Sequence, residues 1–398
     1  MRNVNAGGLG IGDDHPPRIM GVLNVSRESP YDPSVFADPG EAAAYVDGMI
    51  DEGADVVDVG LESANKRYEV LTAAEERERL DVAVEAVASV SGDAVFSIET
   101  RYHEVAEEAL SRGFDMVNDV CGFADPEMPA VCSAHDAAVV KMASPPDLER
   151  PGAVGDVDWA ARNSPEWAAT ATYVDEVYEA LRQNGMTEKT ILDPAFGGWS
   201  ERKTLADDRE TFRRLREFRG FGRPLLVSIN RKNFLREVAG RETEAALPVS
   251  LGATAMAVER GAHVVRTHDV AETRDAALIG ATFARRRLRD PGDVSVEELD
   301  VTTGAEAARH LDRLGADPAI ARRAVVRVFE FEGLAPGDRA ALVTAAAGTD
   351  AVVTAGTDGT SALLVGTPAA LDAAAEAAGG SDGLAAALAR IADETDPC

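Results

Sequence analysis

Between residues 18 and 288 the sequence repeats one unit eight times: a short apolar run followed by a longer amphipathic segment. The apolar runs cover residues 19–23, 56–59, 95–98, 116–117, 137–142, 191–192, 225–229 and 263–265. The helical segments cover residues 40–52, 72–90, 102–112, 126–135, 165–184, 207–218, 247–260 and 270–287. This arithmetic predicts a (β/α)8 TIM barrel, because an open doubly wound sheet usually has fewer units. The runs are apolar throughout, as expected for parallel strands buried on both faces.

The sequence changes after residue 288, where a Pro-Gly pair (Pro291 and Gly292) suggests a linker. Residues 291–398 lack lysine and predict a small C-terminal α+β domain, to which the sequence assigns no role. Its expected helices cover residues 304–314, 317–324 and 335–347, and its expected strands cover 325–331, 351–354 and 361–365. An Asp-Gly turn predicts that the last two strands form a hairpin. His310 is expected at the surface of a helix, and residues 1–17 form an N-terminal extension.

The net charge of −29 disfavours non-specific binding to nucleic acid or to an anionic membrane. Basic residues comprise 35 arginines and only five lysines, and this acidic, arginine-rich composition resembles that of proteins from salt-loving organisms. Three cysteines without metal-type spacing, no apolar signal core and no run of 18 apolar residues predict a soluble cytoplasmic protein.

Polar residues stand where several predicted strands end. They are Asn24, Glu62, Glu99, Asn118, Asp193, Asn230, Lys232, Arg266 and His268. The active site of a barrel lies at the C-terminal ends of its strands, so these side chains are expected to converge there.

Three segments in combination carry a family resemblance: Asn24-Val25-Ser26, Asn230-Arg231-Lys232 and Arg266-Thr267-His268-Asp269-Val270. With the other strand ends, they make residues 18–287 resemble the dihydropteroate synthase family of pterin-binding barrels. That resemblance implies a transferase of folate-type biosynthesis. It would join 6-hydroxymethyl-7,8-dihydropterin diphosphate to p-aminobenzoate or a related arylamine and release diphosphate. It also implies a homodimer.

The resemblance assigns a role to seven side chains. Pterin would be held by Glu99, Asn118, Asp193 and Lys232, and diphosphate by Asn24, Arg266 and His268. Lys232, Arg266 and His268 would be the catalytic residues. Mg²⁺ is the implied cofactor, with Asn24 as its protein ligand, because a hard cation prefers oxygen. Since diphosphate carries several negative charges, the site is expected to be locally cationic.

Two loops depart from the family pattern. After Asn24 the chain continues Val-Ser-Arg-Glu-Ser, and after Glu62 it continues Ser63-Ala64-Asn65-Lys66-Arg67. Ser63, Ala64, Lys66 and Arg67 are the candidate acceptor loop, with Lys66 or Arg67 replacing the family's arginine. The pterin and diphosphate ends are thus better preserved than the acceptor end, so the amine acceptor can differ from p-aminobenzoate.

Two alternatives stay open at this stage. One is a non-catalytic pterin-binding paralogue or assembly module, which the altered loops favour. The other is a methyl-folate-binding component of a methyltransferase, which would need Asp193 and Asn118 but not Lys232, Arg266 or His268.

Overall fold

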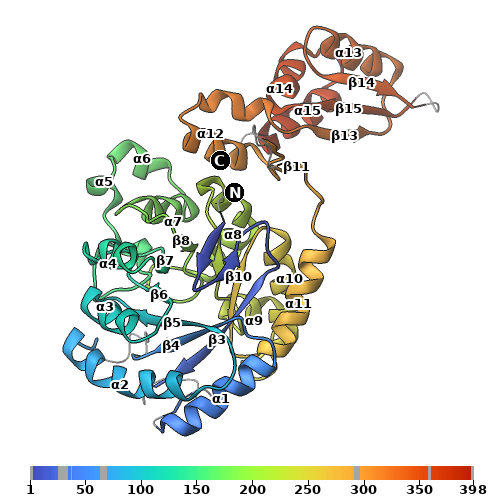
Figure 1. Ribbon diagram of the computed structural model, residues 1–398. Coiled ribbons are helices and arrows are strands. Elements are labelled where there is room, and N and C mark those ends of the chain that lie inside the picture. The colour runs from blue at the N-terminus through green and yellow to red at the C-terminus, as the bar shows by residue number, and fades with distance from the viewer. Residues whose placement is uncertain are drawn as a thin grey trace. The chain divides into compact units, whose positions relative to one another are not determined.

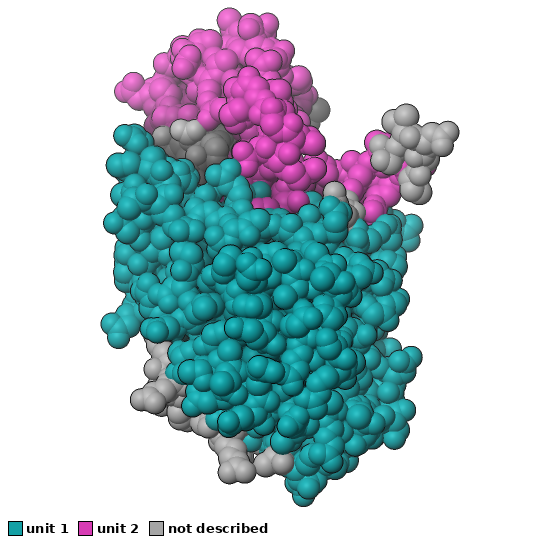
Figure 2. Space-filling view, turned by 60° about the vertical axis from the view of Figure 1, so that its left-hand side comes forward, with its two compact units in different colours: residues 1–215, 222–286 teal, residues 216–221, 287–398 magenta. Residues whose placement is uncertain are grey.

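The computed structural model describes residues 3–25, 35–36, 38–62, 70–290, 296–356 and 360–395. The chain divides into two compact units, coloured in Figure 2. Unit 1 comprises residues 1–215 and 222–286, and unit 2 comprises residues 216–221 and 287–398. None of the helices in these ranges is long and apolar enough to cross a membrane.

Unit 1 is a barrel of eight parallel strands surrounded by helices (Figure 1), which confirms the predicted fold class. The strands are β3 (Arg18–Asn24), β4 (Val56–Gly60), β5 (Val95–Thr100), β6 (Met116–Asp119), β7 (Ala138–Met142), β8 (Thr190–Asp193), β9 (Leu226–Val227) and β10 (Val264–Thr267). Their order is β8-β7-β6-β5-β4-β3-β10-β9, and a parallel bridge between Leu192 and Leu225 joins the two ends.

The helices of unit 1 follow the predicted alternation. They are α1 (Pro39–Asp51), α2 (Ala73–Ser89), α3 (His103–Ser111), α4 (Met128–Ala134), α5 (Trp159–Arg162), α6 (Pro165–Thr170), α7 (Tyr173–Arg182), α8 (Leu205–Arg213), α9 (Asn233–Ala239), α10 (Leu247–Glu259) and α11 (Val270–Phe283), with the 3₁₀ turn η2 (Val154–Asp156). The helix expected over 207–218 ends at Arg213, and the 3₁₀ turn η3 (Leu215–Phe221) that follows belongs to unit 2 except for its first residue. The single helix expected over 165–184 is wrong. The first helix ends at Thr170, and the second begins directly after Thr172, whose side chain forms a capping box with Asp175.

The N-terminal residues contribute to the barrel. Strands β1 (Val4–Ala6) and β2 (Leu9–Ile11) form an antiparallel hairpin. Val4, Ala6 and Ile11 share one buried cluster with the first residues of several barrel strands, including Val56 and Val264. The hairpin therefore closes the N-terminal end of the barrel, which leaves the opposite end for the polar residues.

Unit 2 has its own apolar core, which includes Phe331, Leu342, Leu364 and Leu388. Its strands β13 (Arg327–Phe331), β14 (Val352–Ala355) and β15 (Ala362–Gly366) form an antiparallel sheet in the order β13-β15-β14, so the predicted hairpin pairing of the last two is present. The other elements are β11 (Arg289–Asp290), β12 (Val296–Glu297), α12 (Gly304–Leu314), η4 (Pro318–Arg323), α13 (Pro336–Ala347), α14 (Pro368–Ala377) and α15 (Asp382–Thr395).

The expectation for His310 is wrong, because its side chain is buried. It shares one face of α12 with Glu306 and Ala307, four and three residues earlier, and both of those are buried as well. Of the cysteines in the described ranges, Cys121 and Cys132 are free and buried.

Candidate active site

Inward-facing side chains of the barrel change from apolar to polar along several strands. Residues two apart share a face, so Asp58, Ser97 and Glu99 lie above the apolar residues that start β4 and β5. In register, Asp58 is opposite Ser97 and Glu99 is opposite Asn118. This alternation places the polar set at the C-terminal ends of the strands, where a barrel builds its active site.

Arg266 is the centre of the polar cluster. Its Nε lies 2.8 Å from Asp58 Oδ2, and its Nη2 lies 2.6 Å from Glu99 Oε2. Asn118 Nδ2 donates to the same Asp58 oxygen at 2.8 Å. A guanidinium has five N–H donors, so these two ion pairs fix the plane of Arg266 and leave further donors for a ligand.

Asp58 is the site residue that the sequence analysis missed. Its side chain is completely buried, and it joins Arg266 of β10 to Asn118 of β6 across the barrel. A signal was available, because an aspartate inside an apolar strand that is buried on both faces needs a partner. Within the described ranges, Asp58 Oδ1 and the neighbouring Ser97 Oγ are buried without a hydrogen-bond partner.

Asp193 ends β8 within the same charged cluster. Its Oδ1 accepts a hydrogen bond from the Ala195 backbone at 2.8 Å. Burial raises the pKa of Asp193 to about 6, against the opposing effect of Lys232, Arg266 and Lys203. Burial likewise raises the pKa of Glu99 to about 7, although Arg266 opposes the shift. The pKa values of both carboxyl groups therefore lie above the ordinary values for their residue types.

Lys232 is the residue just before α9, and its Nζ lies 5.9 Å from the centre of the Trp199 ring. Burial and the charge of Arg266 lower its pKa, while Asp193 raises it. The preceding residue, Arg231, has a left-handed backbone (φ 51°) and forms a two-point ion pair with Asp269 at 2.9 Å. This pair ties the loop after β9 to the loop after β10.

His268 follows β10 in that second loop. Its backbone N–H donates to Asn230 Oδ1 at 3.5 Å, and Asn230 Nδ2 donates in turn to Asp269 at 2.9 Å. Burial, together with the charges of Arg266 and Lys232, lowers the pKa of His268 to about 3. The imidazole is therefore neutral at physiological pH and is a hydrogen-bonding group rather than a cation.

The described residues do not make the site uniformly cationic, because most of its cations have a carboxylate partner. Among the described residues, Arg266 is matched by Asp58 and Glu99, Arg231 by Asp269, and Lys203 by Asp208. Carboxylates accompany these cations because an unpaired charge buried in a barrel is costly. A polyanionic ligand would need further positive charge.

Asn24 ends β3 on the rim of the barrel. A Cβ atom on the adjacent Gly60 would lie 3.0 Å from Asn24 Oδ1, so glycine leaves room for this amide. Elsewhere in unit 1, His103, Glu104 and Asp125 form a group that could hold a metal ion. That group does not include Asn24.

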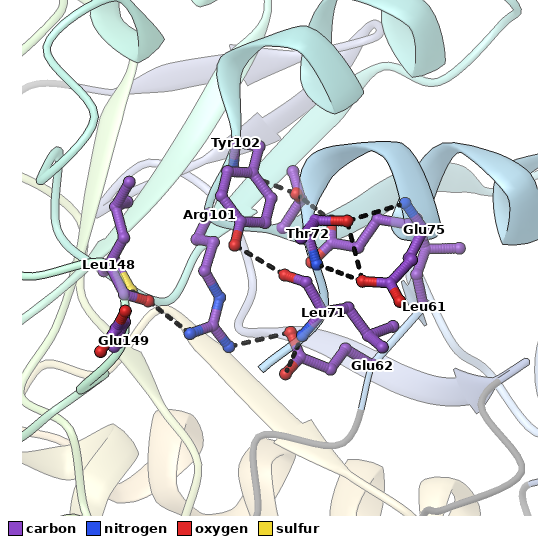
Figure 3. A network of polar contacts seen from close by, with 12 residues as sticks. Leu61, Glu62, Leu71, Thr72, Glu75, Arg101, Tyr102, Leu148 and Glu149 are labelled. Carbon is purple, nitrogen blue, oxygen red and sulfur yellow. Dashed lines mark hydrogen bonds and ion pairs between the residues drawn. The ribbon is translucent and has the colours of Figure 1, made fainter. Parts of the chain in front are cut away.

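The candidate acceptor residues Ser63, Ala64, Lys66 and Arg67 lie outside the described residues, but the chain on either side is well anchored (Figure 3). Arg101 Nη2 donates to Glu62 at 3.0 Å, and its Nη1 donates to the Leu148 carbonyl at 2.5 Å. Glu62 also accepts the Leu71 N–H at 3.3 Å, and Tyr102 Oη donates to the Leu71 carbonyl at 2.6 Å. Residues 62 and 71 are thus joined directly.

Comparisons with known proteins agree on one family. A family model described as "Pterin binding enzyme" matches residues 20–268. A probable bifunctional folylpolyglutamate synthase/dihydropteroate synthase of Halobacterium salinarum is 32% identical over 66% of this chain and 31% of that protein. The chain therefore spans about a third of the length of the bifunctional relatives that it matches.

Shorter relatives are matched over nearly their whole length. The dihydropteroate synthase of Escherichia coli is 30% identical over 68% of this chain and 93% of that protein. A dihydropteroate synthase structure from Coxiella burnetii, in complex with pteroic acid, has a TM-score of 0.56 and 27% identity, covering 70% of this chain and 98% of that one. The barrel fold, the polar cluster at its C-terminal end and these matches show that the chain belongs to the dihydropteroate synthase family of pterin-binding enzymes.

Proposed function

We propose that the barrel is a dihydropteroate synthase that joins 6-hydroxymethyl-7,8-dihydropterin diphosphate to p-aminobenzoate or a related arylamine. The observation that carries the proposal is the cluster of Asp58, Glu99 and Arg266 beside Asp193 and Lys232. The pteroic acid bound by the Coxiella relative combines a pterin with an aminobenzoate and so supports both substrates.

The pterin end of the site is built from carboxylate and amide groups. A pterin presents a guanidine-like edge whose N–H groups suit the Asp193 carboxylate as a two-point, charge-assisted contact. Asn118 Nδ2 donates a hydrogen bond to Asp58, so the side-chain carbonyl oxygen of Asn118 can accept a hydrogen bond from the pterin ring. The unpartnered Asp58 Oδ1 and Ser97 Oγ also suit a ligand rich in hydrogen-bonding groups.

The diphosphate end uses Arg266, neutral His268 and Asn24. In the reaction the bond between the pterin methylene and the diphosphate oxygen breaks, and its electron pair leaves with diphosphate. The arylamine nitrogen then forms the new C–N bond and loses a proton. Arg266, held in place by two carboxylates, would donate to the departing oxygens without reorganising, which is the efficient way to stabilise developing charge.

We propose that the site binds Mg²⁺, and two observations support this. The Asn24 amide oxygen is a hard ligand at the strand end, and Arg266, the central cation of the site, is already paired with two carboxylates. When bound, Mg²⁺ would supply positive charge to the diphosphate. Asn24 is the residue that would hold it. We also propose that the protein is a homodimer and that it acts in a cytoplasm with a high salt concentration.

Diphosphate release tests the function. The purified chain should release diphosphate from the pterin substrate in the presence of Mg²⁺ and p-aminobenzoate, and Arg266→Ala should lower the rate by roughly 10²–10³-fold. Substituted arylamines should be compared in the same assay to define the acceptor. Pterin binding without release, whichever amine is supplied, would instead identify a non-catalytic paralogue.

A methyl-folate-binding methyltransferase component is distinguished by the same variant. Such a protein would bind a methylated reduced folate, and Arg266→Ala would leave that binding unchanged. Loss of pterin diphosphate binding in Arg266→Ala favours the synthase.

A further inference from the structure

A buried ion pair lies behind the loop that follows β8, and the proposed function gives it no role. Lys203 Nζ lies 2.7 Å from Asp208 Oδ1, and the two side chains are only 2% and 4% exposed. Lys203 Nζ also donates to the Ala195 carbonyl at 2.7 Å. The pair thus contacts the backbone two residues after the candidate pterin carboxylate, Asp193.

The loop between Asp193 and Trp199 has an unusual backbone. Ala195 has a φ of 60°, the left-handed region that residues with a Cβ avoid unless their surroundings hold them there. Gly197 also has a positive φ, and a Cβ at this position would lie 3.1 Å from Lys232 Nζ. A turn of this shape needs hydrogen bonds to persist.

Three side chains supply those hydrogen bonds. Asp193 Oδ1 accepts the Ala195 N–H at 2.8 Å, while Lys203 donates to the carbonyl of the same residue. Asp208 accepts the Gly197 N–H with both oxygens, each at 3.2 Å. Ala195 is therefore held on one side by the candidate pterin carboxylate and on the other by Lys203.

We propose that Lys203 and Asp208 are positioning residues for pterin recognition, which fix the Ala195 turn and thereby the direction of the Asp193 carboxylate. This role rests on the proposed function. Because the Ala195 N–H binds one lone pair of Asp193 Oδ1, the orientation of the turn sets the plane of the carboxylate and so the direction in which both oxygens are offered to a ligand. A displacement of the turn would misdirect the two-point contact with the pterin edge, whose strength depends on its geometry.

Lys203 also acts on Asp193 through its charge. The cations that face Asp193 are Lys232 before α9, Arg266 on β10 and Lys203 after β8, and each lowers the pKa of Asp193 against the effect of burial. Without Lys203 the pKa of Asp193 would rise, so pterin binding would be lost at a higher pH than in the unsubstituted protein. A residue that only stabilised the fold would not move this pH.

Binding of 6-hydroxymethylpterin by titration calorimetry, repeated over a range of pH, tests the role. Lys203→Met keeps the length of the side chain and removes its charge, and it is expected to weaken pterin binding at least tenfold, with the half-loss of binding shifted to higher pH. The KM for the arylamine is expected to stay within about twofold, because the turn lies on the pterin side.

A double variant guards against loss of folding, since Lys203→Met alone leaves Asp208 buried and unpaired. Lys203→Met with Asp208→Asn has no unpaired charge and keeps an acceptor for the Gly197 N–H, yet Ala195 still loses its donor. Tyr173→Phe is the matched control, because the Tyr173 ring lies 5.4 Å from Lys203 Nζ and keeps its place without the hydroxyl. This control is expected to bind normally.

The outcomes separate the two proposals. If the unsubstituted protein fails to bind the pterin, the proposed function falls and this role falls with it. If the unsubstituted protein binds and the folded double variant binds with the same affinity and pH dependence, the positioning role alone is overturned.

Discussion

Asp58→Asn is the sharpest test of the site geometry. Asp58 Oδ2 accepts two hydrogen bonds of 2.8 Å, from Arg266 and from Asn118, inside a completely buried environment. Asparagine has the same shape and can place its carbonyl oxygen where both donors point. The substitution therefore removes the charge while the two hydrogen bonds remain.

The magnitude follows from the loss of charge assistance. Hydrogen bonds to charged groups contribute about 1.5–3 kcal/mol and neutral ones about 0.5–1.5 kcal/mol, so the bond from Asn118 weakens by about 1–1.5 kcal/mol. The bond from Arg266 keeps its charged donor but loses the opposite charge of its acceptor, for which we take a loss of the same size. The sum is about 2–3 kcal/mol, which corresponds to roughly 30- to 150-fold. We expect kcat for diphosphate release to fall by that factor, because Arg266 then keeps only one of its two ion pairs, the one with Glu99.

The assay combines steady-state diphosphate release with denaturant unfolding, and Asp55→Asn is the matched control. Asp55 pairs with Arg18 at 3.1 Å at the opposite end of the barrel, where both side chains are partly exposed. This control should lower the free energy of unfolding modestly and leave kcat unchanged. A kcat for Asp58→Asn within about threefold of the unsubstituted protein, or an equal loss in both variants, would refute the reasoning.

Four further predictions follow from the described residues. Pterin affinity should fall as pH drops below about 6, because protonated Asp193 cannot accept two N–H groups, and calorimetry can measure this. The contribution of Asp193 to the stability of the ligand-free protein should have the opposite trend: it should be lost as pH rises from the ordinary pKa of 3.8 through the raised value of about 6, which unfolding at several pH values checks. His268→Asn should keep more activity than His268→Leu, at a ratio constant from about pH 5 to pH 8, because the pKa near 3 keeps the imidazole neutral over this range. Asn24→Ala should raise the Mg²⁺ concentration needed for half-maximal diphosphate release, with pterin binding in the absence of Mg²⁺ unchanged. Potassium chloride should raise the free energy of unfolding, measured with urea, because salt screens the repulsion within a chain of net charge −29.

The sequence was sufficient for the barrel because the relevant signals are local. Apolar runs mark strands buried on both faces, and amphipathic segments mark the helices between them, so all eight strands could be placed before any contact was known. Glu99, Asn118, Asp193, Lys232 and Arg266 were likewise expected at strand ends. Their convergence follows from the parallel arrangement of the strands.

Tertiary structure alone decided how these residues are charged and aimed. The sequence suggested a cationic site, but the barrel brings Asp58 and Glu99 within 2.8 Å and 2.6 Å of Arg266, residues more than 150 positions apart in the chain. The sequence also gave no sign that Ala195 would adopt a left-handed backbone held by Lys203. Pairing across a closed barrel depends on strand register and burial, and neither is a property of a single segment. The periodicity of apolar residues along the chain therefore determines which helices and strands form. What the site can bind is determined by its buried charged side chains, whose partners depend on how the fold brings distant strands together.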